Sequence, residues 1–208
     1  MNGASMQASL PAMKKEETAL LVVDMQNDFV RHEGYLGKNG HDMSPVLAIV
    51  PDLSRLVGFC RDAGVSRIFV RSIHSRDTWA SNWVKRFGGL TDPPHCRANT
   101  WGAEIVEELK PGDDEPVVTK HLYSAMLDTD LPVILRSKAI RNLLVTGTQT
   151  NVCVDSTVRH AFMMNFVTIT VRDCVATDDV DLQEPILRNL ARYFGYVADS
   201  REVMKALK

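Results

Sequence analysis

The sequence lacks the features that mark several specialised classes of protein. Its four cysteines, among 208 residues, are widely spaced and form no CxxC pair, so we expect reduced thiols and a cytoplasmic protein. No apolar run approaches the roughly 18 residues of a membrane span, so no membrane association is expected. Lysine and arginine number 24 against 26 acidic residues, which leaves a net charge of −2 and no basic cluster for nucleic acid.

The beginning of the chain has no continuous apolar segment. Residues 1–17, MNGASMQASLPAMKKEE, are mostly small or polar, and their basic residues Lys14 and Lys15 come late. A signal peptide would place such residues before an apolar segment. We therefore expect a flexible tail over 1–17, followed by a single domain over 18–208 that is long enough to bury a full core.

Short apolar runs alternate with helical patterns along the domain. The runs expected to form strands are 19–23, 67–71, 116–119, 142–146 and 167–171, with a short edge strand at 196–197. The expected helices are 44–63, 102–109, 131–138, 151–164, 182–193 and 200–207, and 74–100 reads as a long loop. This alternation predicts an α/β fold with a doubly wound, mainly parallel sheet of five or six strands and helices on both faces.

Reactive side chains occur where three of these strands end, which is where doubly wound sheets bind ligands. They are the carboxylate of Asp24, the ammonium of Lys120 and the thiol of Cys153 in GTQTNVCVDST. Thr150 or Asn151 can cap the following helix, which places Cys153 in its first turn. Unpaired N–H groups and the helix dipole favour an anion there, so we expect a lowered thiol pKa and an oxyanion site.

Each of these residues also has an ordinary structural explanation. Cys153 fits a buried apolar thiol equally well, Asp24 fits a loop cap, and Lys120 fits a solvated strand end. Together they favour catalysis, because a nucleophilic thiol needs a base such as Asp24 and a neighbouring cation such as Lys120.

The segments that carry these residues resemble the isochorismatase-like cysteine hydrolase family. They read LLVVDMQNDF at 20–29, KHLYSA at 120–125 and VTGTQTNVCV at 145–154, and the likeness extends over 18–198. The resemblance implies a triad of Asp24, Lys120 and Cys153, and a cis peptide bond between Thr148 and Gln149. It also implies an oxyanion hole formed by the N–H groups of Gln149 and Cys153, a small-molecule substrate, no cofactor, and a homodimer or homotetramer.

The choice of reaction depends on Cys153 and on the residues around His74. Isochorismatases cleave a vinyl ether and can do so without this thiol, so its presence favours hydrolysis of an amide-type C–N bond through a thioester. Nicotinamidases hold a metal with an Asp-x-His pair. In this sequence Ser72 stands in place of that aspartate, two residues before His74, and the next histidine is His95. We therefore expect no metal. Among the metal-free members, the segments 151–161 and 193–199 most resemble ureidoacrylate and N-carbamoylsarcosine amidohydrolases.

Aromatic and polar residues of the loops are candidates for the substrate pocket, although packing explains the aromatic ones as well. The candidates are Phe29, Tyr35, His74, Arg76, Trp79, Trp83, Tyr123 and Gln149. Arg76 or Arg86 could clamp a substrate carboxylate. Two other classes stay open. A nucleotide- or flavin-binding module lacks the expected glycine-rich motif after any strand, and a catalytically silent family scaffold is disfavoured by the intact triad.

Overall fold

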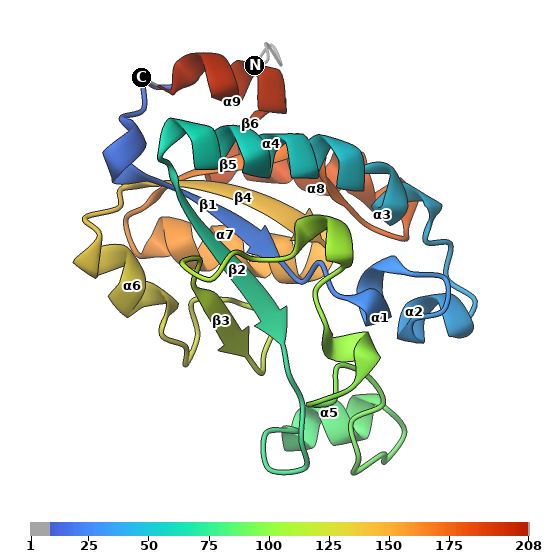
Figure 1. Cartoon of the computed structure of the whole chain (residues 1–208). Coiled ribbons are helices and arrows are strands. Elements are labelled where there is room, and N and C mark those ends of the chain that lie inside the picture. Colours follow the sequence, from blue (N-terminus) through green and yellow to red (C-terminus); the bar gives the residue numbers. More distant parts are fainter. Residues whose placement is uncertain (1–8, 208) are drawn as a thin grey trace.

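A six-stranded sheet with all strands parallel forms the centre of the computed structural model, which describes residues 9–207 (Figure 1). The strands are β1 (Thr18–Val23), β2 (Ser66–Ser72), β3 (Val117–Lys120), β4 (Asn142–Thr148), β5 (Val167–Ala176) and β6 (Tyr196–Ala198). Their order is β3-β2-β1-β4-β5-β6, so the direction of winding reverses between β1 and β4. The predicted doubly wound α/β fold is confirmed, and its switch point lies beyond the carboxyl ends of β1 and β4.

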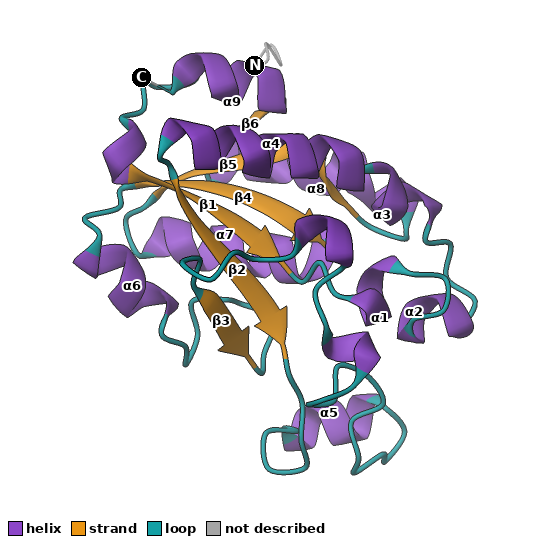
Figure 2. Cartoon of the chain, in the orientation of Figure 1, coloured by secondary structure: helices purple, strands orange, loops and turns teal. Residues whose placement is uncertain are grey.

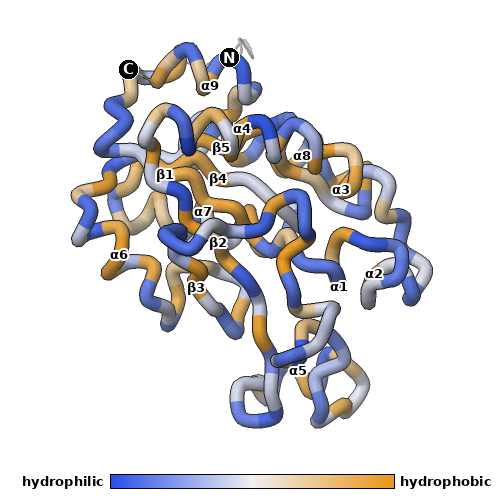
Figure 3. Tube along the Cα trace, in the orientation of Figure 1, coloured by the Kyte–Doolittle hydropathy of each residue, from blue (hydrophilic) through white to orange (hydrophobic). Residues whose placement is uncertain are grey.

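Helices cover both faces of this sheet (Figure 2). One face packs against α3 (Ser44–Ala48), α4 (Val50–Ala63) and α9 (Ser200–Ala206), and the other against α6 (Leu131–Ser137), α7 (Asp155–Met163) and α8 (Val180–Tyr193). Successive residues of β1 alternate between the faces: Leu20 and Val22 join the first core, while Leu21 and Val23 join the second. β1 is accordingly apolar from Ala19 to Val23, whereas β4 is apolar only in its first half, at residues 143–145 (Figure 3). Within the described residues, no helix is long and apolar enough to cross a membrane.

Several predicted elements differ from the structure near prolines and in the loops. The single helix expected from residue 44 is two helices, α3 and α4, and Pro45 and Pro51 lie in their first turns because proline has no N–H to donate. The helix expected over 102–109 is wrong. That segment forms two 3₁₀ turns, Trp101–Ala103 and Glu107–Leu109, because its backbone bonds to the loop after β1, as from Asn27 N to Glu104 O at 2.9 Å.

Short helices also form within the expected loops. The loop after β1 contains α1 (Asn27–Val30) and α2 (Tyr35–Lys38), and the segment 74–100 contains α5 (Ser81–Arg86). Figure 1 shows α5 projecting with its loops beyond the carboxyl end of β2. These insertions therefore lie at the edge of the sheet where ligands are expected.

The residues just before β1 pack on the domain. Residues 1–8 of the predicted tail lie outside the described part of the chain. Met13 is 1% exposed, belongs to the core beneath α4 and α9, and donates its N–H to Ala206 O at 3.2 Å. A 3₁₀ turn, Lys15–Glu17, then leads into β1. The packed domain therefore begins before residue 18.

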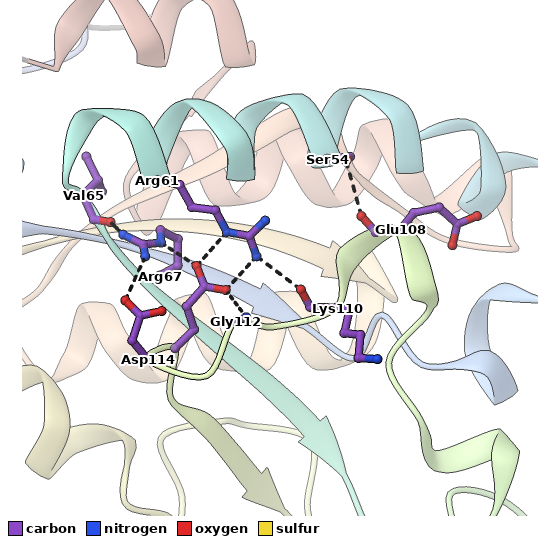
Figure 4. Close-up of polar contacts among 9 residues, drawn as sticks. Ser54, Arg61, Val65, Arg67, Glu108, Lys110, Gly112 and Asp114 are labelled. Carbon is purple, nitrogen blue, oxygen red and sulfur yellow. Dashed lines mark hydrogen bonds and ion pairs between the residues drawn. The ribbon is translucent and has the colours of Figure 1, made fainter.

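A buried carboxylate joins α4 to the amino ends of β2 and β3. Glu115 accepts hydrogen bonds from Arg61 Nε and Nη2 at 2.9 and 2.7 Å, from Arg67 Nε at 2.7 Å and from Gly112 N at 2.8 Å. Figure 4 shows the two arginines converging from α4 and β2, with Asp114 at the margin. The arginine hydrogen bonds hold the pKa of Glu115 down, to about 2, against the opposing effect of burial. This network lies at the opposite edge of the sheet from the candidate site.

Candidate active site

The carboxyl ends of β1 and β2 are held together by one buried glutamine. Gln26 accepts a hydrogen bond from Ser72 N at 2.7 Å and donates to Ser72 O at 2.9 Å. Asp24 has a left-handed backbone with φ of 53°, and its N–H donates to Val70 O at 2.9 Å. Such a backbone is uncommon outside glycine, although Asp adopts it more readily than most residues. The result is that the Ser72 hydroxyl donates to Asp24 Oδ1 at 3.1 Å.

β4 passes close to β1 at Gly147. Gly147 pairs with Val23, has φ of 105°, and a Cβ at this position would lie 2.0 Å from Val23 O. Only glycine fits this approach without displacing the strand. The peptide bond between Thr148 and Gln149 that follows is cis.

The ammonium of Lys120 lies at the centre of the buried polar residues. Its Nζ is 2.8 Å from Asp24 Oδ2 and 2.8 Å from Ser72 Oγ. The same atom is 3.0 Å from Leu122 O and 3.4 Å from Cys153 Sγ. Burial opposes a charge on Lys120, but the Asp24 carboxylate overcomes this effect and raises the pKa of Lys120 above its ordinary value. The cation is therefore permanent and lies between the carboxylate and the thiol.

Cys153 lies in a wide helical turn, Thr150–Val154, that continues into α7. The expectation of a lowered thiol pKa is wrong. Burial raises the pKa of Cys153, Lys120 offsets part of this effect, and Asp24 adds to it through its charge and a hydrogen bond. A position at the start of a helix does not lower the pKa of Cys153 here, because the desolvation of the buried sulfur exceeds the attraction of one cation. The thiol is thus protonated in the free protein, next to a carboxylate able to accept its proton.

A cavity of about 120 Å³ opens onto these residues. Its lining comprises Asp24, Phe29, Leu36, Ser72, His74, Trp83, Phe87, His95, Tyr123, Thr148, Gln149, Val152 and Cys153. Gln149 Oε1 accepts from Asp178 N at 2.8 Å, while its Nε2 is buried without a hydrogen-bond partner among the described residues. His74 Nδ1 and His95 Nδ1 are likewise buried and unpaired within that part of the chain. These atoms are enclosed by the protein, and the surface that the cavity itself presents is mainly apolar.

The sequence-family model of the isochorismatase domain matches residues 18–202 of the chain. The chain belongs to the isochorismatase family. It is 31% identical to the ureidoacrylate amidohydrolase RutB of Serratia proteamaculans, over 90% of this chain and 82% of that protein. A cysteine hydrolase from Pseudomonas syringae pv. phaseolicola has the same fold, with a TM-score of 0.87, 27% identity and 98% of both chains covered. N-carbamoylsarcosine amidase from Thermoplasma acidophilum superposes with a TM-score of 0.73 and 25% identity, over 88% of this chain and 96% of that one. The chain is a hydrolase of this family.

Five of the eight pocket residues expected from the sequence line the cavity of this isochorismatase-family hydrolase, whereas Tyr35, Arg76 and Trp79 do not. Arg86, the alternative clamp for a carboxylate, is exposed and does not line it either. Arg76 is 73% exposed at its side chain and pairs bidentately with Asp92, so it does not reach the cavity. Trp79 lies behind the wall, against His74 with ring centroids 5.2 Å apart, and donates Nε1–H to Leu90 O. Tyr35 likewise packs behind His95, with ring centroids 5.1 Å apart.

Other lining residues have little signal in the sequence. Ser72 is noted in the sequence only as the residue that stands in place of the aspartate of a nicotinamidase metal pair, and nothing in the pattern of 74–100 places His95 at the cavity. The rings of His74 and His95 nevertheless meet edge to face, 5.0 Å apart. Within residues 9–207, no group of three or more His, Cys, Asp or Glu side chains is placed to hold a metal ion. The Ser72 hydroxyl instead faces Asp24 and Lys120.

Proposed function

We propose that this hydrolase cleaves a C–N bond of a small amide, carbamoyl or ureido compound, with Cys153 as nucleophile, Asp24 as base and Lys120 as the stabilising cation. The observation that carries the proposal is the position of Lys120 Nζ, 2.8 Å from Asp24 Oδ2 and 3.4 Å from Cys153 Sγ. A base and a nucleophile that line one cavity, with a buried cation in contact with both, form the constellation that covalent catalysis requires. Relatives named for ureidoacrylate and N-carbamoylsarcosine support a substrate with a hydrolysable C–N bond.

The first half of the reaction forms a thioester and releases an amine. Asp24 takes the Cys153 proton as the sulfur attacks the substrate carbonyl, whose electron pair moves to its oxygen. The backbone N–H groups of Gln149 and Cys153 are the proposed donors to this oxyanion. The intermediate collapses, the C–N bond breaks, and protonated Asp24 gives its proton to the departing ammonia or amine. Because the thiol pKa is raised, proton removal and attack are coupled, and each proton transfer is expected to contribute about 10²–10⁴-fold.

The second half hydrolyses the thioester. Asp24 removes a proton from a water molecule, whose oxygen attacks the acyl carbon and expels the Cys153 sulfur. The proton then passes from Asp24 to the sulfur, which restores the starting state. Throughout, Lys120 keeps its charge and compensates the negative charge as it moves between carboxylate and sulfur.

Ammonia release from a panel of amides, N-carbamoyl amino acids and ureido acids tests the proposal. We expect Cys153→Ala to abolish release and Cys60→Ala, at a buried cysteine of α4, to retain it. Mass spectrometry of the acid-quenched enzyme is expected to find the acyl group on the peptide that contains Cys153. Ammonia release that survives Cys153→Ala would refute the proposed nucleophile.

A further inference from the structure

The cavity next to Cys153 offers no positive charge to a ligand from the described residues. None of the residues that line it is an arginine, and the neighbouring cation, Lys120, is only 1% exposed. An ammonium group has three protons to donate. Lys120 faces three oxygen atoms, on Asp24, Ser72 and Leu122, so it has none left for a substrate carboxylate.

The two histidines of the cavity are neutral at neutral pH. Burial lowers the pKa of His74 to about 3, with further contributions from His95 and Lys120. Burial also lowers the pKa of His95 to about 4, although the nearby carboxylates of Asp28 and Asp24 oppose the effect. Neutral imidazoles donate and accept hydrogen bonds but contribute no charge.

The remaining fixed charge beside the cavity is negative. Lys120 compensates Asp24, while Asp28, whose charge acts on His95, accepts hydrogen bonds from Tyr35 N and Cys96 N at 3.0 and 2.7 Å. Arg31, the arginine nearest to Asp28 in sequence, pairs with Glu108, and Arg76 in the loop after β2 pairs with Asp92. An anionic ligand would lose its hydration in the cavity without meeting a cation among the residues that line it.

The uncharged groups of the cavity suit a planar, neutral ligand. Phe29, Trp83, Phe87 and Tyr123 form aromatic walls. Asp24 is the one carboxylate among the residues that line the cavity, Lys120 compensates its charge, and the rest of the exposed lining is mainly apolar. We propose that the site selects an uncharged carboxamide or carbamoyl compound and discriminates against substrates that carry a carboxylate near the scissile bond. This inference rests on the proposed function and narrows its substrate class to uncharged compounds. It sets this protein apart from the relatives named for ureidoacrylate and N-carbamoylsarcosine, which are carboxylates.

Alkylation of Cys153 by a matched pair of reagents tests this selection without knowledge of the substrate. Iodoacetamide and iodoacetate have the same length and the same leaving group. The first carries an uncharged amide where the second carries a carboxylate. Peptide mass spectrometry gives the rate of Cys153 alkylation by iodoacetamide divided by the rate with iodoacetate. Dividing this value by the same ratio for glutathione gives a normalised ratio, which we expect to be at least ten. A normalised ratio near one, or in favour of iodoacetate, would overturn the inference. Alkylation by neither reagent would also overturn it, because the cavity would then not admit a small amide.

A charge placed in the cavity wall provides the complementary experiment. Phe87→Arg is expected to lower the normalised ratio at least threefold, whereas Phe87→Leu, which removes the ring without adding charge, should keep it tenfold or more. If Phe87→Arg does not fold, Leu36→Arg places the cation at another residue of the lining, with Leu36→Met as its control. An unchanged ratio in the folded arginine variant would contradict selection by charge. The proposed function has its own test, because it fails if Cys153→Ala still releases ammonia. The alkylation ratios do not affect that result.

Discussion

Lys120 and Asp24 form an ion pair of 2.8 Å in which each side chain is only 1% exposed. Removing one partner from such a pair leaves an uncompensated buried charge, which typically costs about 3–5 kcal/mol. We expect Lys120→Met to lower the free energy of unfolding by that amount and to reduce ammonia release more than about 100-fold. Urea unfolding and steady-state kinetics measure the two effects.

The exposed ion pair of Arg76 and Asp92 provides the control for this variant. Arg76→Met also removes a cation from a carboxylate, but water surrounds both groups. Its unfolding midpoint and activity should match those of the wild type. A Lys120→Met protein that is as stable and active as Arg76→Met would show that the buried pair has no role.

Ser72 is expected to position the carboxylate rather than to react. Its hydroxyl donates to Asp24 Oδ1 and accepts from Lys120 Nζ, which fixes the carboxylate relative to the sulfur. Without it, Asp24 can rotate, and small misplacements of a catalytic group cost up to about 10²-fold in rate. We expect Ser72→Ala to lower kcat about 10- to 100-fold with KM nearly unchanged. Ser75→Ala, at an exposed serine of the next loop, should change neither constant. A Ser72→Ala variant altered in KM alone would assign Ser72 to substrate binding instead.

The groups at the strand ends were predictable from the sequence because parallel strands bring their carboxyl ends to one edge of the sheet. Asp24 and Lys120 each follow a short apolar run, and the turn before Cys153 has a clear glycine signal, so no side-chain geometry was needed to group them. The sign of the Cys153 pKa shift was not predictable in this way. It depends on how deeply the sulfur is buried and on the distances to Asp24 and Lys120, which only the folded chain defines.

The loop segments were less predictable for a different reason. Residues 74–100 have no apolar periodicity, and they are organised by packing of His74, Trp79, Trp83 and His95 on one another. Tertiary hydrogen bonds likewise determine the 3₁₀ turns that replace the helix expected over 102–109, since Ala103 O accepts from Gln26 Nε2 at 2.8 Å. Local sequence cannot specify partners so distant along the chain.

Glu115 should make stability depend on pH in the acid range. Hydrogen bonds from Arg61, and to a smaller extent from Gly112 and Arg67, lower its pKa from 4.5 to about 2 in the folded state. The folded protein therefore favours the ionised carboxylate. The resulting stabilisation is complete above pH 4.5 and is lost as the pH falls toward 2.

The expected result for Glu115→Gln is a loss of about 2–3 kcal/mol at pH 7, since bonds between charged groups are replaced by neutral ones. The difference from the wild type should shrink between pH 4.5 and about 2, as followed by urea unfolding at each pH. Asp114→Asn, whose carboxylate is exposed and 3.9 Å from Arg67, is the matched control and should follow the wild type. A constant difference across this pH range would exclude ionised Glu115 as its source.

Two glycines are expected to respond to the same substitution in opposite directions. Gly147→Ala would place a Cβ 2.0 Å from Val23 O at a φ of 105°, which forces β4 away from β1 and costs ~3 kcal/mol. Gly58 lies within α4, and a Cβ added there would meet no neighbouring atom within 4 Å, so Gly58→Ala should stabilise the helix by about 0.5–1 kcal/mol. Because Gly147 directly precedes Thr148, only the first variant should also lose activity. Thermal unfolding and ammonia release measured on both proteins check the pair, and a well-tolerated Gly147→Ala would contradict the close approach of the two strands.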